Sequence, residues 1–276
     1  MGPSLLTLER PNPRSDALNL GSVLFMSATT VNSDIGTYQV VLLPHDHISN
    51  VIRRSGGPYE PMLVSIVREL TKPGRVIVDV GANLGNHTIY WAKAGRRVIA
   101  FEPNPLTRSA LLESVRLNNL HDLVDVRSVA LGARTGTGTL HSLLAGNQGA
   151  VAVEPTVGGE IPVVRLDDLA LPHFSVIKID VEGSEESVIL GARETISRVR
   201  PVIVAEALQD DRGVVSLLRD LGYYRLPTSL AGTPTYLYLP MAKSVSVLLH
   251  SPTLSRRLVS GVVRRSGRTV GALFHS

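Results

Sequence analysis

The 276-residue sequence contains no cysteine, which excludes disulfide bonds, thiolate zinc sites and a cysteine nucleophile. Aromatic residues make up only 4% of the chain, so nothing indicates a surface that stacks nucleic-acid bases. No run of about 18 apolar residues occurs, and we expect no membrane-spanning helix. Residues 1–10 lack the charged start and long apolar stretch of a secretion signal. These absences favour a cytoplasmic protein that does not bind nucleic acid.

Acidic residues are absent after position 240, where six basic residues occur: Lys243, Arg256, Arg257, Arg264, Arg265 and Arg268. Taking these six charges from the formal net charge of +4 leaves −2 for residues 1–240. A slightly acidic body argues against a phosphate-binding surface. From residue 254 the apolar and basic positions fall on opposite faces of a helix. We therefore expect either a solvated end or an amphipathic helix for peripheral contact with a membrane or a partner protein.

Strand and helix patterns alternate after residue 75, and apolar residues make up 43% of the chain. This order predicts an α/β, Rossmann-like fold: a mostly parallel seven-stranded sheet with helices on both faces. The expected strands are 76–80, 97–101, 124–131, 175–181, 201–206, 223–226 and 235–239. The expected helices are 86–94, 105–118, 185–197 and 211–221. Residues 132–165, rich in Gly, Thr and Val, predict inserted hairpin strands.

The segment before residue 76 is more mixed. We expect strands at 22–26 and 37–43 and helices at 48–54 and 62–70. The resulting domain prediction is an N-terminal extension of residues 1–56, a catalytic domain of residues 57–240 and a basic tail of residues 241–276.

A glycine-rich turn follows the strand Val76–Val80, and the next strand ends in Glu102. Turn glycines let a ligand approach the backbone, and an acid at the end of the second strand can hold ribose hydroxyls. A dinucleotide-binding motif would need glycine at positions 83 and 86, where this chain has Asn83 and Asn86. The sequence therefore does not predict a turn that binds a pyrophosphate. Asp79 would repel a pyrophosphate, whereas it suits the sulfonium and ammonium of S-adenosylmethionine.

Further acids follow later strands of the predicted sheet, where the carboxyl ends meet at one edge. Lys178 and Asp180 lie on one face of an otherwise apolar strand, either as a buried ion pair or as a catalytic pair. Asp180 is the first candidate for the base or orienting group. Glu182 and Glu206 are the next candidates, and Lys178 would position the acid or a developing alkoxide.

Histidines offer two weaker alternatives. His87 follows the glycine turn and is an alternative base or a contact to the cofactor carboxylate. His45 and His47 flank Asp46 as a metal-ligand pattern, but such a loop triplet is more typical of a solvated segment or a turn cap. We expect no metal requirement.

Several motifs together resemble the FkbM family of class I S-adenosylmethionine-dependent methyltransferases. They lie between about Gly57 and Glu206 and comprise Asp79 to Gly85, Phe101-Glu-Pro-Asn104, Leu166-Asp167, Lys178-Ile-Asp-Val-Glu-Gly-Ser-Glu185, Gly191-Ala192 and Pro201 to Glu206. Tyr59-Glu60 is similar to a pair that often precedes the first motif, which would either close over the cofactor or shape a turn. The resemblance implies an enzyme that methylates a hydroxyl oxygen of a small molecule, sugar or glycolipid-like metabolite.

The resemblance also implies roles for individual residues. Gly81, Asn83 and Gly85 would contact the methionine end of S-adenosylmethionine, with Asp79 beside them. Glu102 would hold the ribose, Asn104 would lie near the adenosine, and Val129 and Ala130 would lie beside the adenine. Asp180 and Glu182 would face the transferring methyl, and residues 143–162, with Asn147-Gln-Gly149 at the rim, would form the acceptor pocket. Transfer to nitrogen and a non-catalytic binding module remain alternatives.

Overall fold

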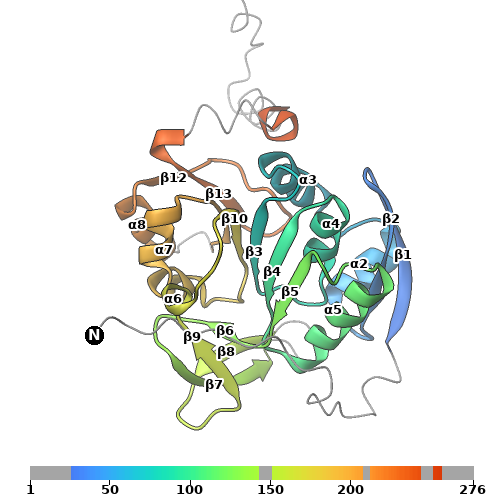
Figure 1. The fold of residues 1–276 in the computed structure, drawn as a ribbon, viewed down its shortest axis with the longest axis horizontal. Helices are drawn as coiled ribbons and strands as arrows, with labels where there is room; N and C mark the ends of the chain where they lie inside the picture. The colour runs from blue at the N-terminus through green and yellow to red at the C-terminus, as the bar shows by residue number, and fades with distance from the viewer. Residues whose placement is uncertain (1–25, 143–150, 208–211, 244–250, 257–276) are drawn as a thin grey trace, which may run out of the picture.

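The computed structural model describes residues 26–142, 151–207, 212–243 and 251–256. Within these residues a seven-stranded sheet has the order β12-β13-β11-β10-β3-β4-β5. Only β13 runs antiparallel to its neighbours. The strands are β3 (Val76–Val80), β4 (Arg97–Phe101), β5 (Val124–Arg127), β10 (Phe174–Ile179), β11 (Val202–Glu206), β12 (Tyr223–Arg225) and β13 (Thr235–Pro240). The predicted Rossmann-like architecture, with a mostly parallel seven-stranded sheet, is confirmed (Figure 1).

Helices cover both faces of this sheet, as the sequence predicts (Figure 1). One face packs against α3 (Pro61–Leu70), α4 (Asn86–Lys93) and α5 (Pro105–Leu117), and the other against α6 (Glu185–Leu190), α7 (Arg193–Val199) and α8 (Arg212–Asp220). The helix starts follow from local chemistry. Asn104 caps α5 by accepting a hydrogen bond from the Leu106 N–H, and Pro105 occupies the first turn, where no backbone N–H is needed.

The predicted single helix over 185–197 is wrong, because two short helices occupy this segment. A Cβ at Gly191 would lie 2.0 Å from the Gly132 carbonyl oxygen, so the chain passes too close to its neighbour for a side chain. The Asp167 carboxylate then accepts hydrogen bonds from the N–H groups of Glu194 and Thr195, at 3.2 and 2.8 Å. These bonds satisfy free donors of a new helix start, which is why α7 begins as a separate helix.

The predicted single strand over 124–131 is also wrong. Its first half is β5 of the central sheet, whereas its second half, β6 (Ala130–Leu131), belongs to a four-stranded sheet of the described residues with the order β6-β9-β7-β8. The other strands are β7 (Gly136–Ser142), β8 (Val151–Pro155) and β9 (Ile161–Val164), which confirms the expected inserted strands. This second sheet lies beneath the lower end of the central sheet in Figure 1.

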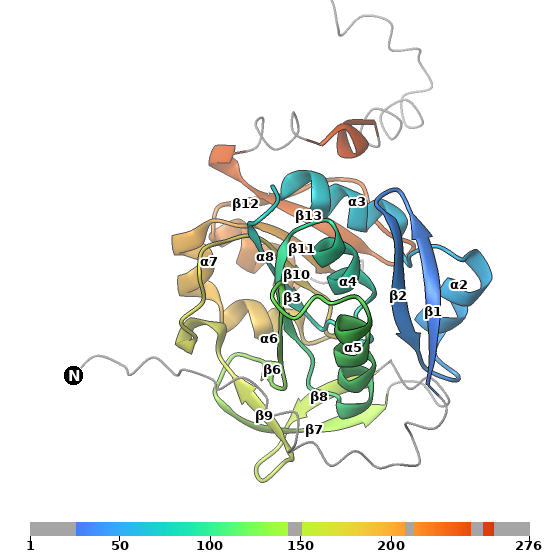
Figure 2. The ribbon, with the colours of Figure 1, turned by 45° about the vertical axis from the view of Figure 1, so that its right-hand side comes forward.

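An N-terminal hairpin of β1 (Ser27–Ser33) and β2 (Gly36–Leu42), followed by α2 (His47–Ser55), flanks α5 (Figure 2). The structure places a strand at β1, which the sequence does not predict; of the strand expected at 22–26, residues 22–25 lie outside the described residues. Ser114 of α5 accepts a hydrogen bond from the Val41 N–H at 2.9 Å, and buried residues of the hairpin share one apolar cluster with the central sheet. The apolar core therefore continues across the domain boundary expected at residue 56.

Residues 252–256 form a helical turn beside α3, at the end of the molecule away from the second sheet (Figure 2). Glu69 of α3 accepts hydrogen bonds from the Ser251 hydroxyl at 2.5 Å and from the Thr253 N–H at 3.1 Å. A carboxylate is favourable at a helix start because the first N–H groups are free. The 3₁₀ turns Leu166–Asp168 and Met241–Lys243 complete the elements. Most of the predicted basic tail lies outside the described residues, and none of the described helices is long and apolar enough to cross a bilayer.

Candidate active site

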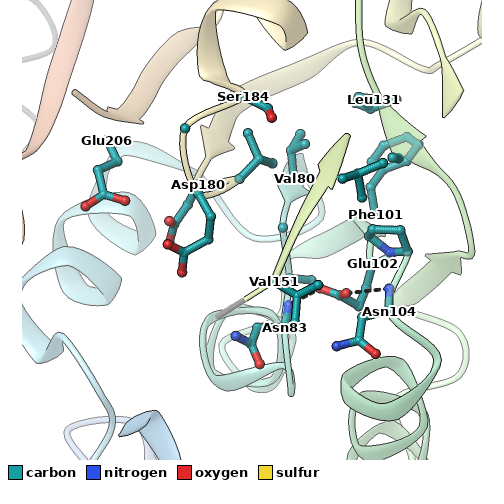
Figure 3. A pocket seen from close by; sticks show the side chains of 18 of the residues that line it. Val80, Asn83, Phe101, Glu102, Asn104, Leu131, Val151, Asp180, Ser184 and Glu206 are labelled. Carbon is teal, nitrogen blue, oxygen red and sulfur yellow. Dashed lines mark hydrogen bonds between the residues drawn. The ribbon is translucent and has the colours of Figure 1, made fainter. Parts of the chain in front are cut away.

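A cavity of about 740 Å³ lies at the carboxyl ends of the central parallel strands. Its walls come from the ends of β3, β4, β10 and β11 and the segments after the first three, from the start of α4, and from the second sheet. Nine residues predicted for the site line it: Gly81, Asn83, Glu102, Asn104, Ala130, Lys178, Asp180, Glu182 and Glu206. In Figure 3, Asn83, Glu102 and Asn104 lie on one side, and Asp180 and Glu206 on the other.

The glycine turn after β3 is fixed by backbone contacts. The N–H groups of Gly81 and Ala82 both donate to the Phe101 carbonyl, at 3.0 and 3.1 Å. Gly81 has a φ of 75°, and a Cβ built on it would lie 1.9 Å from the Asp180 carbonyl oxygen. Only glycine therefore fits where the ends of β3 and β10 approach each other.

A buried lysine joins the two acids at these strand ends. The Lys178 Nζ lies 3.3 Å from Asp79 Oδ1 and 3.2 Å from Asp180 Oδ2, and it donates to the Gly81 carbonyl at 3.1 Å. Burial disfavours the ammonium, but the carboxylates of Asp180 and Asp79 outweigh this effect and raise the pKa of Lys178. Lys178 is therefore a fixed cation that is already paired with Asp79 and Asp180.

Two residues predicted to contact the cofactor do not line the cavity. Asp79 is fully buried behind the turn, where it also accepts a hydrogen bond from the Thr88 hydroxyl at 2.6 Å. Gly85 is the N-cap of α4 with a φ of 92°, and a Cβ there would lie 2.5 Å from the Leu111 side chain. The structure thus replaces their expected ligand contacts with roles in shaping the turn.

Glu102 connects the two loops that would surround a nucleoside. Its carboxylate accepts hydrogen bonds from the Asn83 N–H at 2.6 Å and from the Asn104 N–H at 2.9 Å (Figure 3). Burial raises the pKa of Glu102, and the two backbone donors oppose this shift. A carboxylate has about four lone-pair directions, so each oxygen can accept another donor from a bound ligand.

Carboxyl groups crowd the opposite side of the cavity. Burial would raise the pKa of Asp180, but the Lys178 ammonium, aided by His87, lowers it. Burial and the nearby Asp180 carboxylate raise the pKa of Glu182, and they raise the pKa of Glu206 to about 8. Asp180 is therefore ionised at neutral pH, whereas Glu206 keeps its proton in most molecules.

The exchange Glu206→Gln is expected to change how stability depends on pH. In the folded protein the pKa of Glu206 is raised from 4.5 to about 8, so the side chain keeps its proton between these two pH values. The stability that this protonation contributes is fully present below pH 4.5 and is lost as pH rises through 8. Glutamine has no proton to lose. We expect the variant to gain about 1–2 kcal/mol over the wild type at pH 9, reduced by solvent screening, and little at pH 5.

Thermal unfolding of both proteins at pH 5, 7 and 9 measures this difference. Glu194→Gln on α7, where the side chain is 82% exposed, is the control. A difference between Glu206→Gln and the wild type that stays constant across the three pH values would contradict the assignment.

Residues from the N-terminal part complete the cavity. His47, Tyr59, Glu60 and His87 all line it, together with Thr233 from the loop before β13. Asp46, which also lines it, caps α2 by accepting a hydrogen bond from the Ser49 N–H at 2.7 Å, in agreement with the capping alternative. Among the described residues, no group of three or more His, Asp or Glu side chains is arranged to hold a metal ion.

Thr233 is a cavity residue that no local sequence pattern marks. The sequence indicates Glu60 and His87 separately, but their proximity depends on how α3 and α4 pack. Backbone strain is a further signal: Glu60, Asn83 and Glu182 have φ values of 52°, 53° and 55° and all line the cavity. Strained residues of this kind cluster at functional sites.

The second sheet provides an apolar wall. Leu140, Val151 and Val153 line the cavity from β7 and β8, next to Val129 and Ala130. The latter two are the residues predicted to lie beside the adenine. The expected rim residues Asn147, Gln148 and Gly149 lie outside the described residues.

A sequence model described as "Methyltransferase FkbM domain" matches residues 79–224, more than half of the chain. The chain belongs to the FkbM methyltransferase family. The predicted family resemblance is thereby confirmed, and the chain is a methyltransferase.

Two methyltransferases are among the proteins similar to this chain. The hexuronic acid methyltransferase AglP of Haloferax volcanii is 28% identical over 58% of this chain and 68% of its own length. The 31-O-demethyl-FK506 methyltransferase FkbM of Streptomyces tacrolimicus is 31% identical over 55% of this chain and 74% of its own.

A solved structure of methyltransferase FkbM from Methylobacillus flagellatus KT has a TM-score of 0.44 and 23% identity to this chain. The match covers 60% of this chain and 43% of that protein, so the chain spans less than half of its length.

Proposed function

We propose that this protein transfers the methyl group of S-adenosylmethionine to a hydroxyl oxygen of a small molecule, such as a sugar or a glycolipid-like metabolite. The observation that carries the proposal is the buried Glu102 carboxylate, held beside the Gly81 turn at the edge of one cavity. The family membership supports methyl transfer. The name of the Streptomyces relative specifies an oxygen acceptor in that protein, which supports oxygen here.

The residues present fit S-adenosylmethionine. Glu102 would accept hydrogen bonds from the ribose hydroxyls, and Asn104 and Ala130 would lie beside the adenosine. The absence of a side chain at Gly81 leaves room for the methionine end, which Asn83 would also contact. A cavity of about 740 Å³ is within the usual range for small-molecule sites and is large enough for a cofactor with part of an acceptor.

The acceptor would lie at the carboxyl-rich side. Asp180 and Glu182 would face the methyl group, and Glu206, protonated at neutral pH, would donate a hydrogen bond to an acceptor oxygen. Lys178 fixes the Asp180 carboxylate through their 3.2 Å ion pair. An acceptor without negative charge fits this side best, because like charges repel strongly where solvent is excluded.

S-adenosylmethionine, when bound, would supply an electrophilic methyl group. The task of this chain is to align the acceptor oxygen with that methyl and to take up the hydroxyl proton. Alignment of two reactants can contribute about 7–11 kcal/mol. Asp180, fixed by Lys178, would orient the acceptor hydroxyl, and the apolar wall of the second sheet would exclude water from this end.

Replacing Glu102 by alanine is expected to weaken S-adenosylmethionine binding about 10- to 100-fold, since hydrogen bonds to a charged group contribute about 1.5–3 kcal/mol. Isothermal titration calorimetry of the full chain measures the change. Glu113→Ala on α5 is the control, because that exposed carboxylate pairs with Arg116 and does not line the cavity. Unchanged affinity in Glu102→Ala would refute the ribose assignment.

A test for methyl transfer distinguishes an O-methyltransferase from an N-methyltransferase and from a non-catalytic binding module. Mass spectrometry with a labelled methyl donor and hydroxyl or amine acceptors is expected to show the label on oxygen. Label on nitrogen would identify an N-methyltransferase, and tight cofactor binding without transfer to any acceptor would favour a binding module.

A further inference from the structure

His87 and Glu60 form a buried pair inside the cavity. The His87 Nε2 lies 3.3 Å from Glu60 Oε2, and each side chain is only 8% exposed. The two residues come from different elements: Glu60 is the N-cap of α3, and His87 lies in the first turn of α4. Both line the cavity, on the side that also carries Asp180 and Glu206.

Several contacts fix this geometry. The Asn86 side chain accepts a hydrogen bond from the Tyr59 N–H at 2.9 Å and donates one to the Tyr59 carbonyl at 3.0 Å, which ties the segment before α3 to α4. The Glu60 carboxylate also accepts a hydrogen bond from the Thr233 hydroxyl at 3.3 Å. The imidazole stacks on Trp91 with the ring centres 5.5 Å apart. The ring therefore lies between the Trp91 indole and a Glu60 carboxylate that is itself held in place.

The Nε2 of His87 is buried and has no well-aligned hydrogen bond, although the Glu60 carboxylate is within ion-pair distance. Buried polar atoms without a hydrogen bond are rare in folded proteins, and such an atom in a cavity suggests a functional role. Glu60 also keeps a left-handed backbone, with a φ of 52°, at a position where it makes no side-chain capping bond. Strain without a local benefit indicates that the carboxylate is needed where it lies.

The neighbouring acids are poor proton acceptors. The Lys178 ammonium holds the pKa of Asp180 below its ordinary value, so that carboxylate has a weak affinity for a proton. Glu206, with a pKa raised to about 8, already holds a proton at neutral pH. Histidine is the side chain that most often acts as a general base in enzymes.

We propose that His87 is the catalytic base of the methyl transfer and that Glu60 positions it. The proposal rests on the proposed O-methylation. The acceptor O–H bond breaks and its proton moves to Nδ1 of His87, while the oxygen forms a bond to the methyl carbon. The carbon–sulfur bond breaks, and its electron pair stays on sulfur. The Glu60 carboxylate accepts a hydrogen bond from the Nε2–H and stabilises the imidazolium until its extra proton leaves Nδ1 for solvent.

The first test is a comparison of turnover and cofactor binding. For any methyl hexopyranoside that the wild type methylates, His87→Gln is expected to lower kcat about 10²- to 10⁴-fold, the usual contribution of a general base. Its affinity for S-adenosylmethionine is expected to stay within threefold. A His87→Gln enzyme with kcat within threefold of the wild type would overturn the proposal. A wild-type protein that binds no S-adenosylmethionine would instead overturn the proposed function itself.

A second readout needs no acceptor. Nitrogen-15 spectra of the full chain with S-adenosylhomocysteine at pH 8 are expected to show the His87 ring proton on Nε2, a tautomer preference that Glu60→Gln removes. The His87 signal is identified by its absence in His87→Gln. A proton on Nδ1 at pH 8, or a tautomer unchanged by Glu60→Gln, would overturn the proposal. If no hexopyranoside is methylated, this measurement decides alone.

A second His–Glu pair provides a matched control. His141 Nε2 lies 3.1 Å from Glu154 Oε2 across β7 and β8, but these side chains are 52% and 71% exposed and do not line the cavity. His141→Gln and Glu154→Gln are expected to leave both kcat and the His87 spectrum unchanged. A loss of kcat in these variants equal to that in His87→Gln would show that the effect is not specific to the cavity pair, and would also overturn the proposal.

Discussion

Replacing Gly81 by alanine is expected to destabilise the protein by more than about 3 kcal/mol and to abolish cofactor binding. The new Cβ would lie 1.9 Å from the carbonyl oxygen and 2.9 Å from the carbonyl carbon of Asp180. Both are backbone atoms at the end of β10, which pairs directly with β3, so neither can move without breaking the ladder. The positive φ of 75° adds a second penalty.

Gly74 provides a matched control for this prediction. It has the same φ of 75°, but a Cβ there would meet nothing within 4 Å. Gly74→Ala therefore measures the backbone penalty alone, about 1–2 kcal/mol. Urea unfolding of both variants, with calorimetry of S-adenosylmethionine binding, separates the effects. Equal stability losses would show that β3 and β10 do not approach as closely as the structure indicates.

The exchange Lys178→Met is expected to cost about 3–5 kcal/mol, because it leaves the Asp79 charge buried without a cation. Asp79 is fully buried, and its remaining partner is the Thr88 hydroxyl. Asp180 loses its ion pair as well. Lys93→Met, at the exposed end of α4, is expected to be nearly neutral. Chemical denaturation measures each loss.

Neutralising Asp79 is expected to restore part of this stability. In the double variant Lys178→Met with Asp79→Asn, no uncompensated buried charge remains, so the two losses should not add. The pH response gives a further check. The lowered pKa of Asp180 contributes stability above its ordinary value of 3.8 that is lost as pH falls, so the deficit of Lys178→Met should shrink below pH 4. Additive losses would contradict the buried pairing.

The sequence predicts most of the core because its signals there are local. The buried run Val76–Val80 can only be an interior strand, and the Asn104-Pro105 pair marks a helix start. By contrast, β1 was not recognised, because its side chains are mostly exposed and only Val31 is fully buried. The break between α6 and α7 was missed because its cap, Asp167, lies far from Glu194 in the sequence.

In the candidate site, too, the sequence predicts what depends on local signals and misses what depends on packing. Gly81, Glu102 and Asp180 were predicted because strand ends in a parallel sheet meet at one edge. The sequence could not show that Asp79 and Gly85 lie behind the turn, since that depends on side-chain packing against Lys178 and Leu111. Neither could it pair Glu60 with His87. The catalytic and binding roles assigned to these residues stay predictions.

The stacking of His87 on Trp91 has a practical consequence. Trp91 is the single tryptophan of the chain and is fully buried, so the protein's tryptophan emission comes from one indole in contact with the cavity wall. An imidazolium quenches indole fluorescence more strongly than a neutral imidazole does. The unmodified protein therefore carries its own optical reporter, through which ligand entry and proton arrival at this wall can be followed in real time.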